Sequence, residues 1–159
     1  MPDLNAQDAR LPTPPRPQGH YVPVVIDRGV AHTAGMTPRV DGRLLAQGIV
    51  GRDLTVEQAR ELAGVAAGNA LAAVVAAVGG PERVVRCLQL TVFLAAAPDF
   101  TEHTAVADGA SDTLLAALGP RGAVARAAVG VAGLPSGAPV EVVLTAAVDP
   151  AASRTDRTD

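Results

Sequence analysis

The sequence predicts an α+β domain in which two helices cover the same face of a mixed β-sheet. The chain has 159 residues, a length typical of a single domain. Hydrophobic residues make up 48% of it, enough to fill one core. Extended and helical patterns follow one another in the order β-β-α-β-α-β-β, with more strands than helices. One sheet face is then left uncovered, and we expect another copy of the chain to cover it.

The two ends of the chain differ in composition from its middle. Six of the 13 prolines fall within the first 23 residues, which favours an extended arm over residues 1–18. The last segment, residues 151–159, is short and polar and offers little to bury. We therefore expect one folded domain over residues 19–150.

The first half of this domain predicts a hairpin and a long helix. Residues 21–26 and 30–34 are short extended runs joined by a turn-forming Asp-Arg-Gly sequence. Residues 37–53 contain several glycines and a proline, which predicts a loop with one short strand around residues 44–47. The capping-box sequence Thr-Val-Glu-Gln that begins at Thr55 predicts the start of a helix, which a Gly-Gly-Pro sequence ends at residue 79.

The second half predicts three strands and a second helix. Residues 84–94 are rich in β-branched and aliphatic side chains, which indicates a buried, central strand. A helix is predicted over residues 99–118, with Asp99 or Thr101 as its cap. Two further strands are predicted over residues 125–131 and 140–148, and the connection between them is too long to require that they pair with each other.

Composition and charge exclude several classes of function. The net charge is −3 with a sequence pI near 5.5, and aromatic side chains are scarce, so neither phosphate neutralisation nor base stacking favours nucleic acid as a partner. Lysine is absent, which excludes lysine Schiff-base and P-loop chemistry. The single Cys87 excludes an intrachain disulfide. Neither a signal peptide nor an uninterrupted membrane-length apolar run is visible, so we expect a cytoplasmic protein with no membrane partner.

Arg126 is the first candidate functional residue. Period-two alternation in its strand places Arg126 on one face with Ala128 and Gly130, so its guanidinium has room to hold a ligand carboxylate with two hydrogen bonds. An ion pair with a carboxylate across a subunit interface explains the same pattern. The alternation does not decide between the two.

Glu141 is the second candidate, because it is the only charged residue within the last strand. A carboxylate in such a position must be paired, hydrogen-bonded or tuned for function, since burying an unpaired charge is costly. A structural salt bridge with Arg126, Arg86 or an arginine of a neighbouring subunit is an equal alternative.

The remaining reactive residue types give weaker signals. Tyr21, the only tyrosine, is interpreted as an amphipathic plug or, second, as a pocket wall with a hydroxyl donor. Neither Ser111 nor Cys87 has the sequence context of a nucleophile. No metal ion is predicted, because metal-ligand spacing is missing around the three histidines, His20, His32 and His103.

Four segments together resemble one known family. They are Gly-His-Tyr-Val-Pro at residues 19–23, His-Thr-Ala-Gly at 32–35, Ala-Arg-Ala-Ala-Val-Gly-Val-Ala-Gly-Leu-Pro at 125–135, and Pro-Val-Glu-Val at 139–142. In this order they resemble the RidA family, also called YjgF/YER057c/UK114, over residues 19–148. The segment 106–112 and the loop before Thr55 look like a longer bacterial branch of that family.

The resemblance implies a chorismate-mutase-like fold assembled as a homotrimer, with pockets at the subunit interfaces. Family members hydrolyse 2-aminoacrylate and related enamines or imines to 2-oxo acids and ammonia, without a cofactor. By resemblance, Arg126 holds the carboxylate of a small metabolite and Glu141 positions the attacking water, so both are expected to be catalytic. Tyr21 and Gly35 are expected to line the substrate pocket.

The chain also departs from the family pattern. Ala34, Ala128 and Val143 stand where many members carry serine, cysteine and a second glutamate, so this pocket is less polar. A trimeric protein that binds 2-oxo acids, or acts like a chaperone, without catalysis is therefore the alternative. Some relatives carry the name endoribonuclease, but the acidic charge and scarce aromatic residues argue against that activity.

Overall fold

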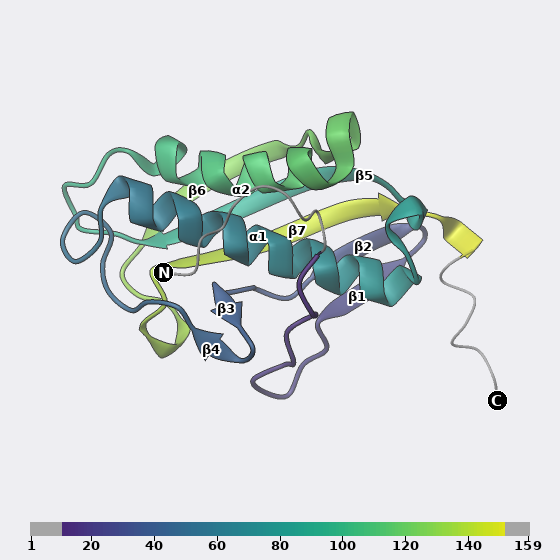
Figure 1. Cartoon of the computed structure of the whole chain (residues 1–159), viewed down its shortest axis with the longest axis horizontal. Coiled ribbons are helices and arrows are strands. Elements are labelled where there is room, and N and C mark those ends of the chain that lie inside the picture. Colours follow the sequence, from purple (N-terminus) through teal and green to yellow (C-terminus); the bar gives the residue numbers. More distant parts are fainter. Residues whose placement is uncertain (1–10, 152–159) are drawn as a thin grey trace.

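The computed structural model describes residues 11–151 and contains a five-stranded mixed sheet (Figure 1). The strands follow the order β1-β2-β7-β5-β6, and only the β5–β6 pair is parallel. β5 has a partner on each side, as predicted for a central strand, and it separates β6 from β7. The strands of this sheet are β1 Val24–Asp27, β2 Val30–Thr33, β5 Val84–Ala95, β6 Ala125–Val131 and β7 Val140–Val148.

Two helices, α1 Val56–Val78 and α2 His103–Leu118, lie side by side on one face of this sheet (Figure 1), as predicted. They approach closely because Gly109 has no side chain. A Cβ atom at Gly109 would lie 2.8 Å from the backbone carbonyl carbon of Arg60, closer than real contacts allow. The absence of a side chain therefore sets the spacing between the helices.

The predicted caps of α1 are confirmed. The Thr55 hydroxyl accepts from Gln58 N at 3.2 Å, and Thr55 N donates to the Gln58 side chain at 2.9 Å. Gly79 ends the helix with a φ of 89°. The most apolar 18-residue window of α1 has a mean hydropathy of 1.7, enough in length and composition for a membrane span, but 67% of it is buried inside this fold. α1 is thus placed as a core helix.

Two β-hairpins lie in the N-terminal half. The predicted hairpin is confirmed, and Arg28 and Gly29 turn it with φ values of 48° and 75°. Residues 37–53 were predicted as a loop with a strand around 44–47, but they hold a second small hairpin of β3 Arg39–Val40 and β4 Arg43–Leu44. Its turn uses the Asp-Gly sequence at 41–42, also with positive φ at both residues.

α2 begins later than predicted. The helix starts at His103 with Glu102 as its cap residue, and no side chain caps it, so neither Asp99 nor Thr101 acts as expected. Residues 96–102 instead form an irregular connection in which Phe100 packs against the core and its ring meets that of His103 edge-on. Three short 3-10 helices occupy other connections, at Pro81–Arg83, Gly119–Gly122 and Pro135–Gly137.

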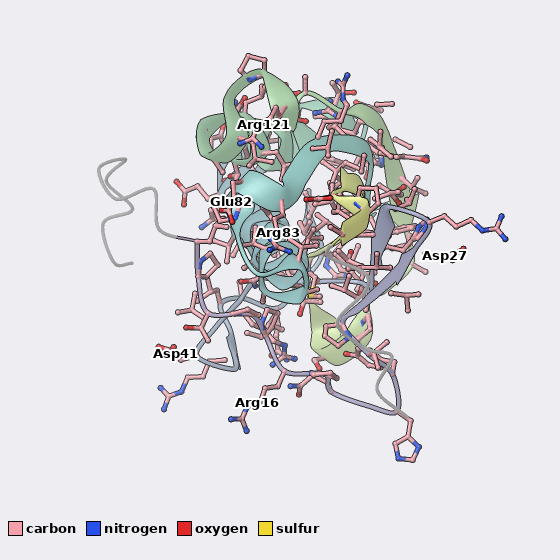
Figure 2. All side chains as sticks on the ribbon, turned by 90° about the vertical axis from the view of Figure 1, so that its right-hand side faces the viewer. Arg16, Asp27, Asp41, Glu82, Arg83 and Arg121 are labelled. Carbon is pink, nitrogen blue, oxygen red and sulfur yellow. The ribbon has the colours of Figure 1, made fainter. Side chains whose placement is uncertain are left out.

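The core lies between the helices and one face of the sheet. Strand residues on that face are fully buried, among them Leu90 and Leu144. The opposite face is open and carries apolar side chains, with Val25 54%, Leu88 37% and Val129 38% exposed. Charged side chains such as Arg16, Asp27 and Asp41 point outward at the rim of the molecule (Figure 2). The predicted uncovered face is therefore present in the single chain.

The described part of the arm crosses α1 without forming a helix or strand. Leu11 packs against the core, and Pro12 lies next to Gly68 of α1. Residues 1–10 of the predicted arm and residues 152–159 of the predicted tail lie outside the described residues.

Candidate functional site

A β-bulge between β2 and β7 places Gly35 next to Glu141. His32 pairs with Thr145, but the next bridge joins Met36 to Val142, so β2 carries one extra residue over this stretch. The Leu144 backbone N–H, which the bulge separates from the ladder, donates to the buried Thr33 hydroxyl at 3.0 Å. The bulge is therefore held by a side chain.

The Glu141 carboxyl group covers Gly35. A Cβ atom at Gly35 would lie 2.6 Å from Glu141 Cδ and closer still to one carboxylate oxygen. Glu141 can occupy this half-buried position only because residue 35 has no side chain. Gly35 thus shapes the surroundings of the carboxylate, and its place in a substrate pocket stays a prediction.

The Glu141 carboxylate has neither a hydrogen bond nor an ion pair with any residue between 11 and 151. The structural pair with Arg126 or Arg86, one of the two interpretations of Glu141, is not formed within the chain. Arg86 instead donates to the backbone carbonyls of Cys87 and Ala123. Burial raises the pKa of the Glu141 carboxyl above its ordinary value. A half-buried carboxylate with a raised pKa is suited to take up and return a proton.

Arg126 lies on the other side of the sheet, beneath α2. Its Nη1 donates to Asp108 Oδ1 at 2.9 Å and to Ser111 Oγ at 2.8 Å, and its side chain is 18% exposed. The ion pair predicted as an alternative for Arg126 therefore exists, but its carboxylate comes from the same chain. Small neighbours surround it as expected, because Ala128 and Gly130 share its side of the strand.

One edge of the Arg126 guanidinium stays available. Neither Nε nor Nη2 has a hydrogen bond to a protein group within the described part of the chain. These two N–H donors form the side-on fork that binds a carboxylate with two parallel hydrogen bonds. Arg126 is thus fixed at one nitrogen and open at the edge that recognises carboxylates.

The register shows that Arg126 and Glu141 lie on opposite faces of the sheet. Leu90 of β5 pairs with both Arg126 and Leu144, so these three side chains share the helix-covered face. Glu141 lies three residues before Leu144 on a regular stretch of β7, and therefore points to the open face. Within one chain, the two predicted catalytic residues do not meet.

Tyr21 lies at the N-terminal side of β1, with 48% of its surface exposed. Its hydroxyl accepts from Gln18 N at 3.0 Å, and the hydrogen bond from Ala34 N to Pro23 O places this end of β1 next to the Gly35 end of β2. The aromatic ring is therefore not a core plug in the single chain.

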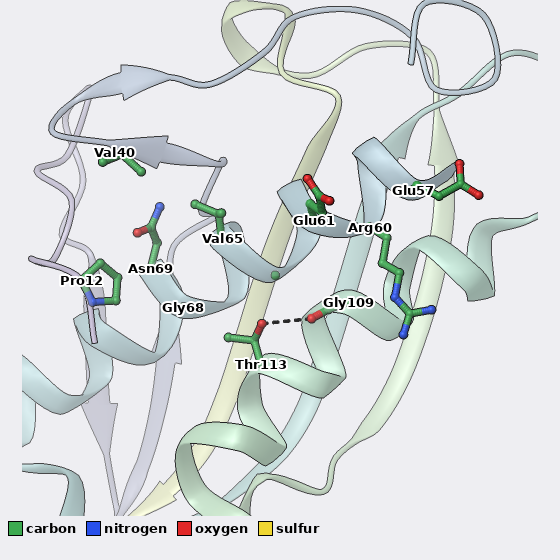
Figure 3. Close-up of a pocket in the computed structure, with 11 residues that line it drawn as sticks. Pro12, Val40, Glu57, Arg60, Glu61, Val65, Gly68, Asn69, Gly109 and Thr113 are labelled. Atoms are coloured by element: carbon green, nitrogen blue, oxygen red, sulfur yellow. Dashed lines mark hydrogen bonds between the residues drawn. The ribbon is translucent and has the colours of Figure 1, made fainter. Parts of the chain in front are cut away.

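Two cavities were not foreseen from the sequence. One, of about 310 Å³, lies where β5 and β6 end and is lined by Phe100, His103 and Gly130. The other, of about 660 Å³, is an open groove on the outer side of α1, between Val40, Arg60 and Gly109 (Figure 3). Neither contains Arg126 or Glu141.

The groove in Figure 3 is explained by packing. It lies over the small residues that let α1 and α2 approach, and the hydroxyl of Thr113 in its floor donates to the Gly109 carbonyl. Asn69 at its other end is already engaged, because its amide donates to the carbonyls of Thr37 and Arg39. Its geometry requires no ligand.

Asp108 and Ser111 are the site residues that the sequence reasoning missed. They lie three residues apart on α2, and residues at this spacing face the same side of a helix. This spacing was the available signal, although it does not reveal which strand the pair faces.

The other reactive groups contribute no further site. Burial raises the pKa of the Cys87 thiol to about 11, which makes it a poor nucleophile. Among residues 11–151, no three His, Cys, Asp or Glu side chains gather where they could hold a metal ion.

The chain is similar to known proteins along most of its length. A family model described as YjgF/chorismate mutase-like, putative endoribonuclease, matches residues 3–147. Protein TCP17 of Trypanosoma cruzi is 40% identical over 141 residues, which cover 88% of each chain.

Several solved structures are also similar to this chain over most of its length. Atu1372 of Agrobacterium tumefaciens, a protein of unknown function, is 38% identical with a TM-score of 0.80, covering 84% of this chain and 85% of that one. A putative endoribonuclease of Shewanella oneidensis is 31% identical with a TM-score of 0.84, covering 87% and 92%. The YjgF gene product of E. coli, 22% identical with a TM-score of 0.60 over 86% and 96%, shares the fold. The predicted chorismate-mutase-like fold is confirmed, and the chain belongs to the YjgF/chorismate mutase-like family.

Proposed function

We propose that this protein hydrolyses small enamines or imines that carry a carboxylate, releasing a 2-oxo acid and ammonia. The observation that supports it most is the geometry of Arg126, because an arginine fixed at Nη1 and open at Nε and Nη2 is prepared for one ligand carboxylate. The substrate is thus proposed to be a small monocarboxylate whose reacting carbon lies next to its carboxyl group.

Glu141 serves as the proton carrier in this proposal. An enamine first tautomerises to its imine, whose carbon is already electrophilic, so no cofactor is required. Glu141 takes a proton from water as the water oxygen bonds to the imine carbon, and it returns that proton to nitrogen. Glu141 next takes the proton of the new hydroxyl group and passes it to the same nitrogen, so that the C=O bond forms, the C–N bond breaks and ammonia leaves. Burial, which raises the pKa of Glu141, makes this carboxylate a better proton acceptor for the first half of the exchange.

The site is proposed to form between copies of the chain. Arg126 and Glu141 point away from opposite faces of one sheet, so a common substrate requires Arg126 of one copy and Glu141 of the next. The exposed apolar side chains of the open face suit such an assembly. We propose the homotrimer that the family resemblance implies.

The first test is a coupled assay in which a dehydratase or an amino-acid oxidase generates the imine. The purified protein should accelerate 2-oxo acid release, and both Arg126→Ala and Glu141→Gln should abolish the acceleration while their oligomeric state stays unchanged. Retained activity in Arg126→Ala would contradict the proposed role of this residue.

A mixing experiment tests the shared site. Arg126→Ala and Glu141→Gln, unfolded together and refolded at equal amounts, should recover about a quarter of the wild-type activity, because random assembly reunites the two intact residues at some interfaces. Each variant refolded alone is the control. A mixture as inactive as its components would show that the site is not shared.

The alternative is a protein that binds 2-oxo acids without turnover, which the less polar residues Ala34, Ala128 and Val143 favour. Calorimetric titration with 2-oxobutyrate would then show binding that Arg126→Ala removes, while the coupled assay would show no acceleration of 2-oxo acid release. Because relatives bear the name endoribonuclease, RNA is added as a third substrate. Cleavage that disappears in Arg126→Ala would replace the proposed reaction.

A further inference from the structure

We propose that Asp108 and Ser111 are positioning residues that orient Arg126 and restrict its site to ligands with a single negative charge. This inference rests on the proposed function of Arg126 as the carboxylate-binding residue. It concerns two side chains of α2 to which neither the sequence pattern nor the family resemblance assigns a role.

Both acceptors engage the same guanidinium nitrogen. Asp108 Oδ1 lies 2.9 Å and Ser111 Oγ 2.8 Å from Nη1, and the two residues are three apart on α2, so one face of the helix presents them together. Two acceptors at one nitrogen fix the plane of the guanidinium. They also leave the Nε–Nη2 edge pointing away from the helix. Preorganisation of this kind lowers the entropy lost when a carboxylate binds.

The neighbours of Arg126 on its own strand give it no other polar anchor. Ala128 and Gly130 share its side of β6 and have no side-chain donor or acceptor. Of the side chains that the structure describes, only those of Asp108 and Ser111 hydrogen-bond to Arg126. Without them, this long side chain on an edge strand would sample several rotamers.

Asp108 also changes the charge of the site. The one ligand carboxylate that bonds to Arg126 is attracted directly, whereas a second negative charge on the ligand finds no further cation in the pair and is repelled by the Asp108 carboxylate. A site of this kind should discriminate against dianions such as inorganic phosphate. Replacing Asp108 by Asn keeps an acceptor for Nη1 but removes this repulsion.

The chain offers a matched control on the same helix. Asp112 Oδ2 accepts from Arg60 Nη2 at 2.6 Å, and this pair joins α2 to α1, away from Arg126. Asp112→Ala therefore removes an ion pair of the same chemical type from the same helix. Its effect on ligand binding reports a purely structural contribution.

The experiment measures KM and kcat in the coupled assay, the dissociation constant of 2-oxobutyrate, and inhibition by inorganic phosphate at low ionic strength. Asp108→Ala should raise KM and the dissociation constant about ten-fold with a smaller change in kcat, and Ser111→Ala about three-fold. Asp108→Asn should restore KM to near the wild-type value, yet bind phosphate several-fold more tightly. Asp112→Ala should leave all these values unchanged.

The outcomes separate this inference from the proposed function. The inference fails if Asp108→Ala and Asp112→Ala change KM and the dissociation constant equally, or if Asp108→Asn binds phosphate no more tightly than wild type. Asp108 is then only structural, while the proposed turnover that requires Arg126 still stands. If the wild-type protein neither binds 2-oxobutyrate nor accelerates imine hydrolysis, the proposed function itself fails. Where Asp108→Ala does not fold, Asp108→Asn and Ser111→Ala decide the question by themselves.

Discussion

The two halves of the proposed site are built in opposite ways. Glu141 lies on the open face of the sheet without a polar partner in the described chain, in space that Gly35 leaves free. Arg126 lies on the covered face and is held by two side chains of α2. In the proposed site, the Glu141 carboxylate is thus left free to exchange a proton, whereas the Arg126 guanidinium is held in place to bind a ligand carboxylate.

The largest effect is expected at Gly35. In Gly35→Ala the added methyl group occupies the position of the Glu141 carboxyl group, which must swing away. Because a displacement of about 1 Å at a reacting group can cost about 100-fold in rate, activity should fall by about 100-fold. Thermal stability should change little, since a flexible side chain can move. Gly133→Ala, with no atom within 4 Å of its new Cβ, is the control for both readouts.

A glycine-to-alanine change in α2, the helix that holds Arg126, should act on the fold first. Gly109→Ala places a methyl group 2.8 Å from the Arg60 carbonyl carbon, and backbone cannot move aside as a side chain can. We expect α2 to lift from α1 and the free energy of unfolding to fall by about 3 kcal/mol. Chemical denaturation measures this, with Ala116→Ser on an exposed position of the same helix as the control. An unchanged denaturation midpoint in Gly109→Ala would show that the spacing between α1 and α2 can adjust to the added methyl group.

The bulge is tested at Thr33. Thr33→Val keeps the shape of the side chain but removes the acceptor of the Leu144 N–H, which is buried there. Leaving this donor without a partner should lower the free energy of unfolding by about 2 kcal/mol, measured in the same denaturation experiment. Thr33→Ser retains the hydroxyl and should recover most of the loss. Equal losses in the two variants would assign the effect to packing instead.

The smallest effect concerns the pH dependence of stability. The pKa of Glu141 is raised in the folded state, so the folded protein holds this proton more tightly than the unfolded chain does. The resulting contribution to the free energy of unfolding is fully present at low pH, where Glu141 is protonated. It is lost as pH rises from the ordinary glutamate value through the raised one. Wild type should therefore lose stability relative to Glu141→Gln over that window. A difference between the two that is independent of pH would show that Glu141 titrates normally.

Local patterns predicted much of the fold. The capping box at Thr55, the glycine after α1 and the alternation in β6 and β7 are short-range signals, and each is confirmed. The β3–β4 hairpin was missed because its Asp-Gly turn lies among other glycines that suggest a loop. The start of α2 was placed too early because Asp99 and Thr101 resemble caps, while packing of Phe100 holds this segment out of the helix.

The candidate site depends on contacts that sequence patterns do not contain. Alternation indicates the face on which Arg126 lies, but the partners Asp108 and Ser111 come from a helix whose rotation the sequence leaves open. The contact between Gly35 and Glu141 depends on one extra residue in β2, and such a register shift is visible only in three dimensions.

The position of β7 has a consequence for how the chain is made. Among the strands of this sheet β7 is synthesised after all the others, yet it lies in the middle of the sheet and joins β2 to β5. A nascent chain that ends before Val140 holds two hydrogen-bonding edges without a partner, and unpaired edges promote aggregation. We therefore expect nascent chains of increasing length to become resistant to protease abruptly, once β7 is complete and clear of the ribosome. Resistance in shorter chains would show that the β1–β2 hairpin and the β5–β6 pair fold without β7.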